Sequence, residues 1–327
     1  MSYLGVICLT PYLLHAESVS RYTISQIVPH LVKLFLNPDE LDGRPHILML
    51  LSDLVTAVSK FTLTEVQALA EPDVLLLQFK DELLNVILVG LNTSSTRRPA
   101  LNALQSMLTP QSLLTDDELT FIVHNINEIL LTDLDDDDSR YQTKSSMFDG
   151  LFLTPVRSDA ALDLLSTIST SKPRHIQEQT LPQLFGLLPD HAPSREANLE
   201  RATYWRVLSA LRKLCVNAEL FETLVIRLTT KLDILCGPAS DNGADIEPSA
   251  AYADSILKTL AQSLTTKVTM KHTDVPKYIN SLVPRLYNMF ICSSLVSVND
   301  NVVVTDRRLV SVAAQIVTLV VQTLSHK

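Results

Sequence analysis

Four cysteines and eight histidines are the side chains in this 327-residue sequence that most often carry nucleophilic or metal chemistry. No two histidines form an HxxxH or HExxH pattern, which would place both imidazoles on one face of a helix. No two cysteines stand at a CxxC spacing, and each lies in an apolar stretch that is typical of a buried thiol. The cysteines are Cys8, Cys215, Cys236 and Cys292. We therefore expect no metal site, no bound cofactor and no activated nucleophile, and hence no enzyme.

The segment from Asp133 to Asp138 is nearly all acidic. Calcium-binding loops space their carboxylates and include a glycine bend, whereas the carboxylates here are almost contiguous. A solvated loop is therefore favoured over a site for a cation or a basic partner. The sequence has only seven glycines, which disfavours glycine-rich phosphate loops and Rossmann turns.

The segment from Arg195 to Val216 is predicted to form one long helix that carries the candidate binding residues. Its basic residues should lie on the solvent side, and we expect them to form a ridge that contacts a protein partner. These residues are Arg201, Arg206, Arg212 and Lys213. Tyr204 and Trp205 lie on the same helix, where core packing is favoured over a role as binding anchors.

The charge and the apolar segments indicate that the chain binds neither nucleic acid directly nor a membrane. The formal net charge of −9 repels phosphate backbones, and the arginine pairs at 97–98 and 307–308 are isolated. The most apolar segment, Leu309 to Leu324, carries its polar residues at spacings of four and three, which predicts an amphipathic helix with a narrow polar edge. These polar residues are Ser311, Gln315, Thr318, Gln322 and Ser325.

Three segments share a proline followed by apolar residues two, five and six positions later. They begin at Ile27, Thr180 and Leu282, with prolines at 29, 182 and 284. Proline at the first turn of a helix needs no hydrogen-bond donor and presets φ. The pattern therefore predicts that each segment begins an amphipathic helix of the same kind.

Further helical segments fill the chain at a spacing of about 40–50 residues per helix pair, which is typical of HEAT or armadillo repeats. They are residues 45–59, 75–91, 97–108, 116–131, 195–216, 220–235, 249–264 and 307–324. The run at Val302–Val304 is the best strand candidate, and it is too short to form a sheet. We predict an all-α, right-handed superhelical solenoid of stacked antiparallel helix pairs.

The solenoid should be divided by one irregular insertion. We expect HEAT-type repeats at 1–132, an acidic loop and insertion at 133–158, and further repeats of the same solenoid at 159–327. The terminal repeats of a complete solenoid have a polar outer face, and neither end here shows one. An internal or truncated section of a longer array is therefore expected.

Several stretches, in order along residues 20–300, resemble the large HEAT-repeat adaptor family of the cytosolic iron–sulfur cluster targeting complex. This is the DNA repair and transcription family named for sensitivity to methyl methanesulfonate, and the likeness is partly to its fungal members. The stretches are Gln26–Phe35, Phe79–Leu83, Val89–Asn92, Ala100–Leu104, Asp163–Ser169, Glu178–Leu184 and Leu220–Leu228. No single stretch is diagnostic, and the ordered series carries the resemblance.

The resemblance implies an adaptor that recruits apo-proteins, such as DNA helicases and polymerases, to the iron–sulfur assembly machinery. It implies a WD-repeat propeller and a small cluster-targeting subunit as partners, a location in cytoplasm and nucleus, and support for DNA repair, replication and transcription. Two other classes stay open from the residues alone. One is another HEAT-repeat interaction protein, such as a nuclear transport receptor or a chromatin-associated protein. The other is a helical enzyme, which would need a pocket with convergent polar groups.

Overall fold

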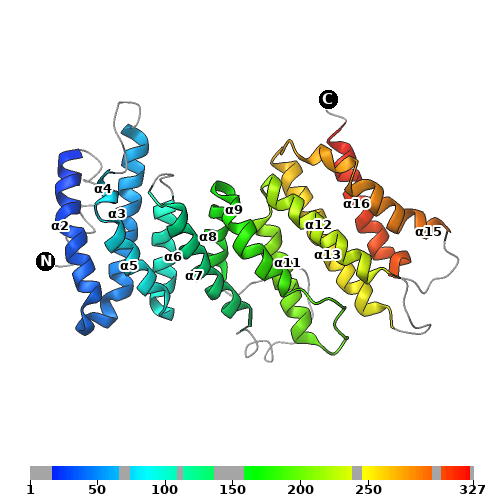
Figure 1. The fold of residues 1–327 in the computed structure, drawn as a ribbon, viewed down its shortest axis with the longest axis horizontal. Coiled ribbons are helices and arrows are strands. Elements are labelled where there is room, and N and C mark those ends of the chain that lie inside the picture. Colours follow the sequence, from blue (N-terminus) through cyan, green and yellow to red (C-terminus); the bar gives the residue numbers. More distant parts are fainter. Residues whose placement is uncertain are drawn as a thin grey trace. The chain divides into compact units, whose positions relative to one another are not determined.

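The computed structural model describes residues 17–65, 74–108, 113–135, 158–237, 245–296 and 303–324. Every regular element in these ranges is a helix, and the run at Val303 forms a single 3-10 turn instead of a strand. Consecutive helices fold back on one another as antiparallel pairs (Figure 1). The predicted all-α helical-repeat solenoid is confirmed. The chain folds as two compact units, of which unit 1 contains residues 1–126 and 152–167, and unit 2 the remainder.

The described part of unit 1 contains two helix pairs, and each helix of one pair packs against a helix of the other. Helix α2 contacts α5, and α3 contacts α6, while α5 also packs on α6. Gly90 of α5 lies so close to Leu48 of α3 that an added Cβ would stand 2.6 Å from its Cδ1 atom. The elements are α2 (Glu17–Leu36), η1 (Pro38–Gly43), α3 (Arg44–Glu65), α4 (Val74–Leu77), α5 (Lys80–Leu91) and α6 (Ser94–Leu108).

The helices α7 (Asp116–Asp135) and α8 (Ser158–Ser171) cross the division between the units. A capping box begins α7: the Glu118 carboxylate accepts from the Thr115 amide at 2.8 Å, and the Thr115 hydroxyl accepts from the Glu118 amide at 3.3 Å. The predicted acidic loop begins inside this helix, since α7 continues to Asp135. Residues 136–157 of the predicted insertion lie outside the described residues.

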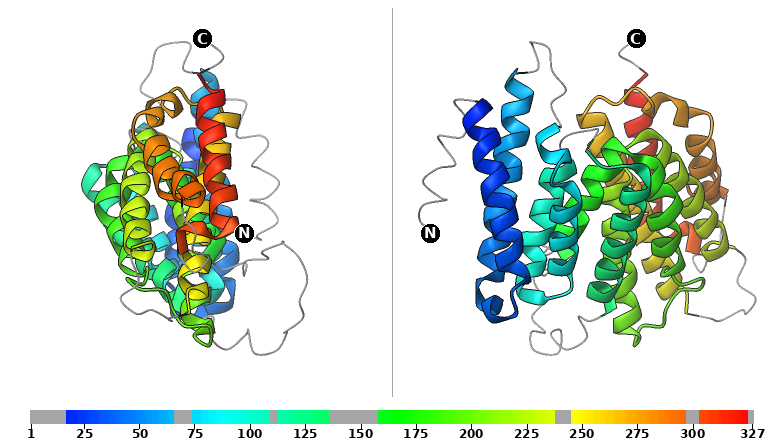
Figure 2. Two further views of the ribbon diagram at one scale, coloured as in Figure 1. Left: turned by 90° about the vertical axis from the view of Figure 1, so that its right-hand side faces the viewer. Right: turned by 60° about the vertical axis from the view of Figure 1, so that its left-hand side comes forward.

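Unit 2 contains three further helix pairs in two layers. One layer holds α10, α12 and the segment η5–α14–η6, and the other holds α11, α13 and α16. In the left view of Figure 2, α16 (red) and the α14–α15 segment (orange) lie side by side, one in each layer. The elements are α9 (Pro173–His175), η4 (Ile176–Thr180), α10 (Leu181–Gly186), α11 (Asn198–Leu214), α12 (Ala218–Leu235), α13 (Glu247–Thr269), η5 (Val275–Ile279), α14 (Leu282–Leu286), η6 (Tyr287–Cys292), α15 (Ser293–Val296), η7 (Val303–Thr305) and α16 (Arg307–Gln322).

The three prolines of the shared pattern do not all begin helices. Pro29 lies in the interior of α2, so the expectation of a helix start is wrong there. Pro182 follows the π-helical turn η4, and the amide of Leu181 bonds back to the carbonyl of Ile176. Pro284 lies within the first turn of α14, and the π-helical turn η6 follows. A π-turn changes the hydrogen-bond register beside a proline, which lets a helical segment continue around a residue without an amide donor.

The interior of unit 2 holds one fully buried charge. The ammonium of Lys267 on α13 bonds to the Val216 carbonyl at 2.8 Å and pairs with the Asp274 carboxylate at 2.9 Å. It also stands 5.1 Å from the ring centre of Phe221 on α12. Lys271, with a φ of 56°, turns the chain between the lysine and its aspartate. The pair therefore ties the end of α13 to α12 and η5.

The last helix has the predicted amphipathic form. Leu309, Ala313, Ile316 and Val320 of α16 are buried, whereas Ser311, Gln315, Thr318 and Gln322 are exposed. Asp306 caps the helix by accepting from the amide of Arg308 at 2.8 Å. Among the described residues, no helix is both long enough and apolar enough to span a bilayer.

Candidate protein-binding surface

No three His, Cys, Asp or Glu side chains in the described ranges are placed to hold a metal ion. Burial raises the pKa of the Cys215 thiol far above its ordinary value, and burial followed by the charge of Asp233 raises the pKa of Cys236 to about 12. Such thiols are poor nucleophiles, because the thiolate is the reactive form. Cys292 is exposed, which corrects the expectation of a buried thiol, and Cys8 lies outside the described residues.

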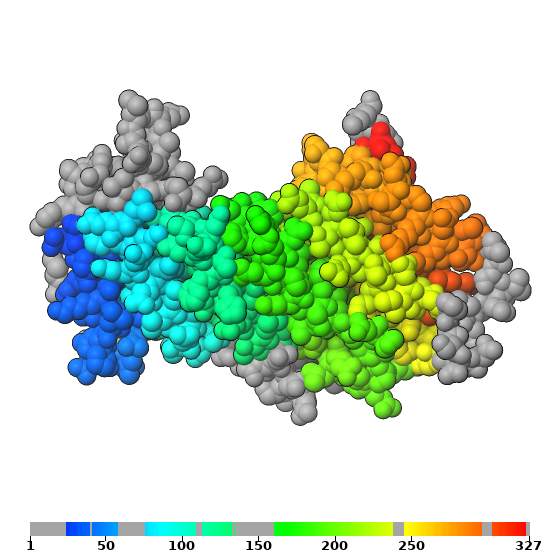
Figure 3. All heavy atoms as spheres, in the orientation of Figure 1, coloured from blue at the N-terminus to red at the C-terminus, as the bar shows by residue number. Residues whose placement is uncertain are grey.

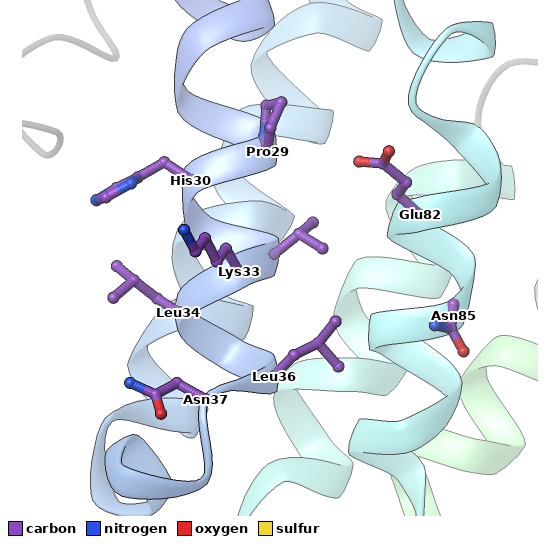
Figure 4. A pocket seen from close by; sticks show the side chains of 9 residues that line it. Pro29, His30, Lys33, Leu34, Leu36, Asn37, Glu82 and Asn85 are labelled. Atoms are coloured by element: carbon purple, nitrogen blue, oxygen red, sulfur yellow. The ribbon is translucent and has the colours of Figure 1, made fainter.

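An open groove of about 850 Å³ lies between α2 and α5 in unit 1 (Figure 4). Pro29, Lys33 and Leu36 line it from α2, and Glu82 and Asn85 line it from α5. Lys33 and Glu82 contribute one cation and one carboxylate to the lining, and the side chains do not enclose the space. The groove is therefore a gap between neighbouring helices on the surface rather than a pocket with convergent polar groups.

The candidate binding residues on α11 form a stripe along one side of that helix. Arg201, Trp205, Ser209 and Arg212 follow at spacings of four, four and three, so they share one face. Trp205, Ser209 and Arg212 are exposed, and Arg201 is half-buried. The opposite side of α11 packs in the core through Tyr204, Val207, Leu208 and Leu211.

A second stripe on the neighbouring helix α13 completes this surface. The indole nitrogen of Trp205 donates to the Ser255 hydroxyl at 3.0 Å, and Arg212 Nη1 donates to Gln262 Oε1 at 2.6 Å. Lys258 lies between these two α13 residues and pairs with Asp254 at 2.7 Å. We call the seven residues the Trp205 face: Arg201, Trp205, Ser209, Arg212, Ser255, Lys258 and Gln262.

Trp205 is not a core residue, which corrects one part of the sequence interpretation. Its side chain is 39% exposed, whereas the adjacent Tyr204 is only 1% exposed. The two rings meet edge to face at 5.8 Å, and the guanidinium of Arg201 stands 5.6 Å from the centre of the indole ring. A large aromatic ring is thus fixed at the surface by a hydrogen bond and two ring contacts. Exposed Trp and Arg side chains of this kind are enriched at the energetic centres of protein interfaces.

The two arginines of the Trp205 face are held in place by uncharged oxygens. Arg212 donates to the amide oxygen of Gln262, and Arg201 donates to the backbone carbonyl of Arg195 at 3.4 Å. Neither arginine forms an ion pair with any residue that the structure describes. The charge of neither guanidinium group is therefore offset by a carboxylate among the described residues.

The other layer of unit 2 has ion pairs between successive repeats. Lys231 reaches Asp190 at 2.8 Å, Lys277 reaches Glu222 at 2.7 Å, and Arg285 pairs with Asp233. We call these three contacts the ion-pair ladder. The hydrogen bond from Lys231 and its charge lower the pKa of Asp190 below its ordinary value. Each cation at these positions is paired with a carboxylate of the preceding repeat, unlike the arginines of the Trp205 face.

The remaining two predicted contact residues lie beside this surface. Arg206 is half-buried and donates from Nη1 to the carbonyl of Leu134 at 2.7 Å. This contact satisfies a terminal carbonyl of α7, as basic side chains commonly do at helix ends. Lys213 is half-buried and follows Arg212 around the helix by about 100°. The Trp205 face therefore includes two of the four predicted residues, Arg201 and Arg212.

The α13 residues of the Trp205 face were missed by the sequence interpretation, although the sequence contains a signal for them. Ser255 and Gln262 each follow their α11 partner by 50 residues, and the ion pair between Arg195 and Asp245 has the same offset. Stacked repeats bring equivalent positions of successive units into contact. Adding one repeat length to Trp205 and Arg212 would have found their partners.

Comparison with known families then shows what the later repeats of the chain are similar to. Residues 207–327 match the family model MMS19_C, described as RNAPII transcription regulator C-terminal. Over these residues the chain is similar to the MMS19 family. This confirms the resemblance drawn from the sequence, since it is the same family. A search of curated proteins gives no significant match.

The MMS19 match covers the later part of unit 2, from the middle of α11 to the end of α16. Of the stretches that carried the resemblance, Leu220–Leu228 lies inside the matched range and forms the first part of α12. Arg212, Ser255, Lys258 and Gln262 also lie within it. In Figure 3 the described residues of unit 2 form adjacent bands from green to orange, in their order along the chain, as expected for repeats that pack on their neighbours.

Proposed function

We propose that this chain is a scaffold that recruits apo-proteins to the cytosolic iron–sulfur cluster assembly machinery. The observation that carries the proposal is the MMS19_C match, which covers the helix pairs from the middle of α11 onward and includes Arg212 and the α13 residues of the Trp205 face. Solenoids bind other proteins over extended faces, so affinity is spread over many side chains with a few dominant ones. The scaffold holds proteins and performs no reaction of its own.

The partners that we propose follow from the family. They are a WD-repeat propeller protein, a small cluster-targeting subunit, and iron–sulfur clients such as DNA helicases and polymerases. Delivery of clusters to these clients would support DNA repair, replication and transcription. The last of these roles agrees with the family description as a transcription regulator. We place the activity in the cytoplasm and the nucleus. The MMS19_C match favours this function over a nuclear transport receptor.

The proposal is tested by co-purification of the full chain with a purified apo iron–sulfur DNA helicase and with the propeller subunit. We expect stoichiometric complexes with at least one of them on size-exclusion chromatography. A second mixture contains a helicase of similar size without a cluster site, and it should give no complex. If the folded chain forms no complex with the apo iron–sulfur helicase and none with the propeller subunit, the scaffold proposal is wrong.

A further inference from the structure

We infer that the Trp205 face binds an acidic protein segment in which two carboxylates flank an apolar side chain. This inference rests on the proposed function and names the chemistry of a partner. Its basis is the arrangement of Arg201, Trp205 and Arg212 on α11 together with the uncharged acceptors that hold them. The segment belongs to a partner protein that the scaffold recruits.

Charge supports an acidic partner at this position. The seven residues of the Trp205 face include three cations, of which only Lys258 has a carboxylate partner among the residues that the structure describes. The chain as a whole has a net charge of −9, so the two unneutralised arginines stand out against an acidic background. Gln262 fixes the Arg212 guanidinium without cancelling its charge. Such a group can accept a carboxylate in bidentate geometry with little loss of conformational entropy.

The spacing of the residues predicts the length of the segment. Arg201 and Arg212 are eleven residues apart on one helix, which places them about 16 Å apart along its axis. An extended segment covers that distance in about five residues. Trp205 lies between the arginines and nearer to Arg201. The apolar side chain of the segment should therefore lie nearer to the carboxylate that pairs with Arg201. Its indole nitrogen already donates to Ser255, which leaves the ring as the group available for contact.

The test uses the full chain and a fluorescein-labelled synthetic peptide as the probe. The peptide carries two aspartates about five positions apart with a leucine between them. One control peptide has asparagines in place of the aspartates, and a second has the aspartates adjacent. Fluorescence anisotropy measures binding to wild type, to Arg201→Gln/Arg212→Gln, and to a matched double variant on the ion-pair ladder, Lys277→Gln/Arg285→Gln.

We expect the aspartate peptide to bind wild type at least tenfold more tightly than either control peptide. The Arg201→Gln/Arg212→Gln variant should lose about tenfold or more in affinity, whereas the ladder variant should bind as wild type does. Both variants alter surface side chains, and circular dichroism checks that each keeps its helical content. The inference is overturned if the asparagine peptide binds equally, if the arginine variant binds unchanged, or if the ladder variant loses as much affinity.

Single-stranded DNA of equal charge is added as a competitor, because phosphates also pair with arginine. Displacement of the peptide by equimolar DNA would assign the surface to nucleic acid and overturn the inference. The failure of this inference is distinguishable from the failure of the scaffold proposal. If the apo-helicase co-purifies with the chain but the peptide does not bind, only the acidic segment is wrong. If neither binds, the scaffold proposal fails as well.

Discussion

Two surfaces of unit 2, the ion-pair ladder and the Trp205 face, join successive repeats in different ways. Ion pairs also join repeats elsewhere beside α11 and α13, between Arg195 and Asp245 and between Arg308 and Glu247. Near α12, the cations of the ion-pair ladder reach carboxylates of the neighbouring repeat. Near α11, Arg201 and Arg212 reach uncharged oxygens, and an exposed tryptophan lies between them. Both arrangements link repeats, but only the second leaves charge available for a ligand. We propose that this difference separates a surface that stabilises the fold from one that binds a partner.

The largest effect that we expect is on the free energy of unfolding and comes from the buried Lys267. Asp274→Ala removes its carboxylate partner and leaves a fully buried ammonium group, which should lower the free energy of unfolding by about 3–5 kcal/mol. Urea denaturation followed by circular dichroism measures the change. The double variant Lys267→Met/Asp274→Leu is the control and should recover most of the loss. Equal losses in both variants would show that packing, and not the buried charge, is responsible.

Adjacent aromatic residues on α11 give the next largest contrast. Tyr204→Ala opens a cavity in the core and should cost about 3–5 kcal/mol of stability. Trp205→Ala removes a side chain that is 39% exposed and should cost only about 1–2 kcal/mol. Peptide binding should show the opposite order, with the larger loss in Trp205→Ala. The same denaturation assay, together with anisotropy on protein that is still folded, compares the two. A larger stability loss at Trp205 would contradict its assignment to the surface.

A smaller effect should separate the two surfaces by ionic strength. Arg285→Gln breaks one ion pair of the ladder, and Arg212→Gln breaks a hydrogen bond to an amide. Each should cost less than about 1 kcal/mol, since exposed polar pairs contribute little. Added salt screens the ion pair and should reduce the cost of Arg285→Gln, but it should leave that of Arg212→Gln nearly unchanged. Denaturation midpoints at low and high salt measure this, and identical salt dependence would remove the distinction.

The smallest effect that we expect is a dependence of stability on pH below 5. The hydrogen bonds from Lys231 to Asp190 and from Arg308 to Asp306 lower the pKa of these carboxyls in the folded chain. A lowered folded pKa stabilises the fold above the unfolded value of about 4, and this stability is lost as the pH falls further. Lys231→Gln should therefore flatten the fall in denaturation midpoint between pH 5 and pH 3. Arg212→Gln, which touches no carboxylate among the described residues, should leave that profile as in wild type.

Much of the fold was predictable from hydrophobic periodicity. The predicted helices at 97–108, 116–131, 220–235 and 307–324 correspond to α6, α7, α12 and α16 within a few residues. The proline pattern predicted a helix start at Pro29, and this was wrong. Tertiary packing stabilises α2 as a helix on both sides of the proline. Local sequence cannot report this, since the helix is stabilised by its contacts with α3 and α5.

The candidate surface was predictable only in part. Amphipathicity placed Arg201 and Arg212 on the solvent side of α11, but it could not show that Arg206 is half-buried against the carbonyl of Leu134. Trp205 was expected in the core because large aromatic residues usually are. Its exposure depends on the position of α13, whose Ser255 accepts its hydrogen bond. Contacts between residues 50 positions apart depend on the stacking of repeats and not on the helix itself.

The most direct test of the account is complex formation by the Trp205 face with an apo iron–sulfur DNA helicase. Isothermal titration calorimetry compares wild type, Arg201→Gln/Arg212→Gln and Lys277→Gln/Arg285→Gln, each confirmed helical by circular dichroism. We expect the helicase to bind wild type and the ladder variant equally, and to bind the Arg201→Gln/Arg212→Gln variant at least tenfold more weakly. Equal affinity for all three proteins would contradict the assignment of the binding surface, and no affinity for any of them would contradict recruitment of this class of client.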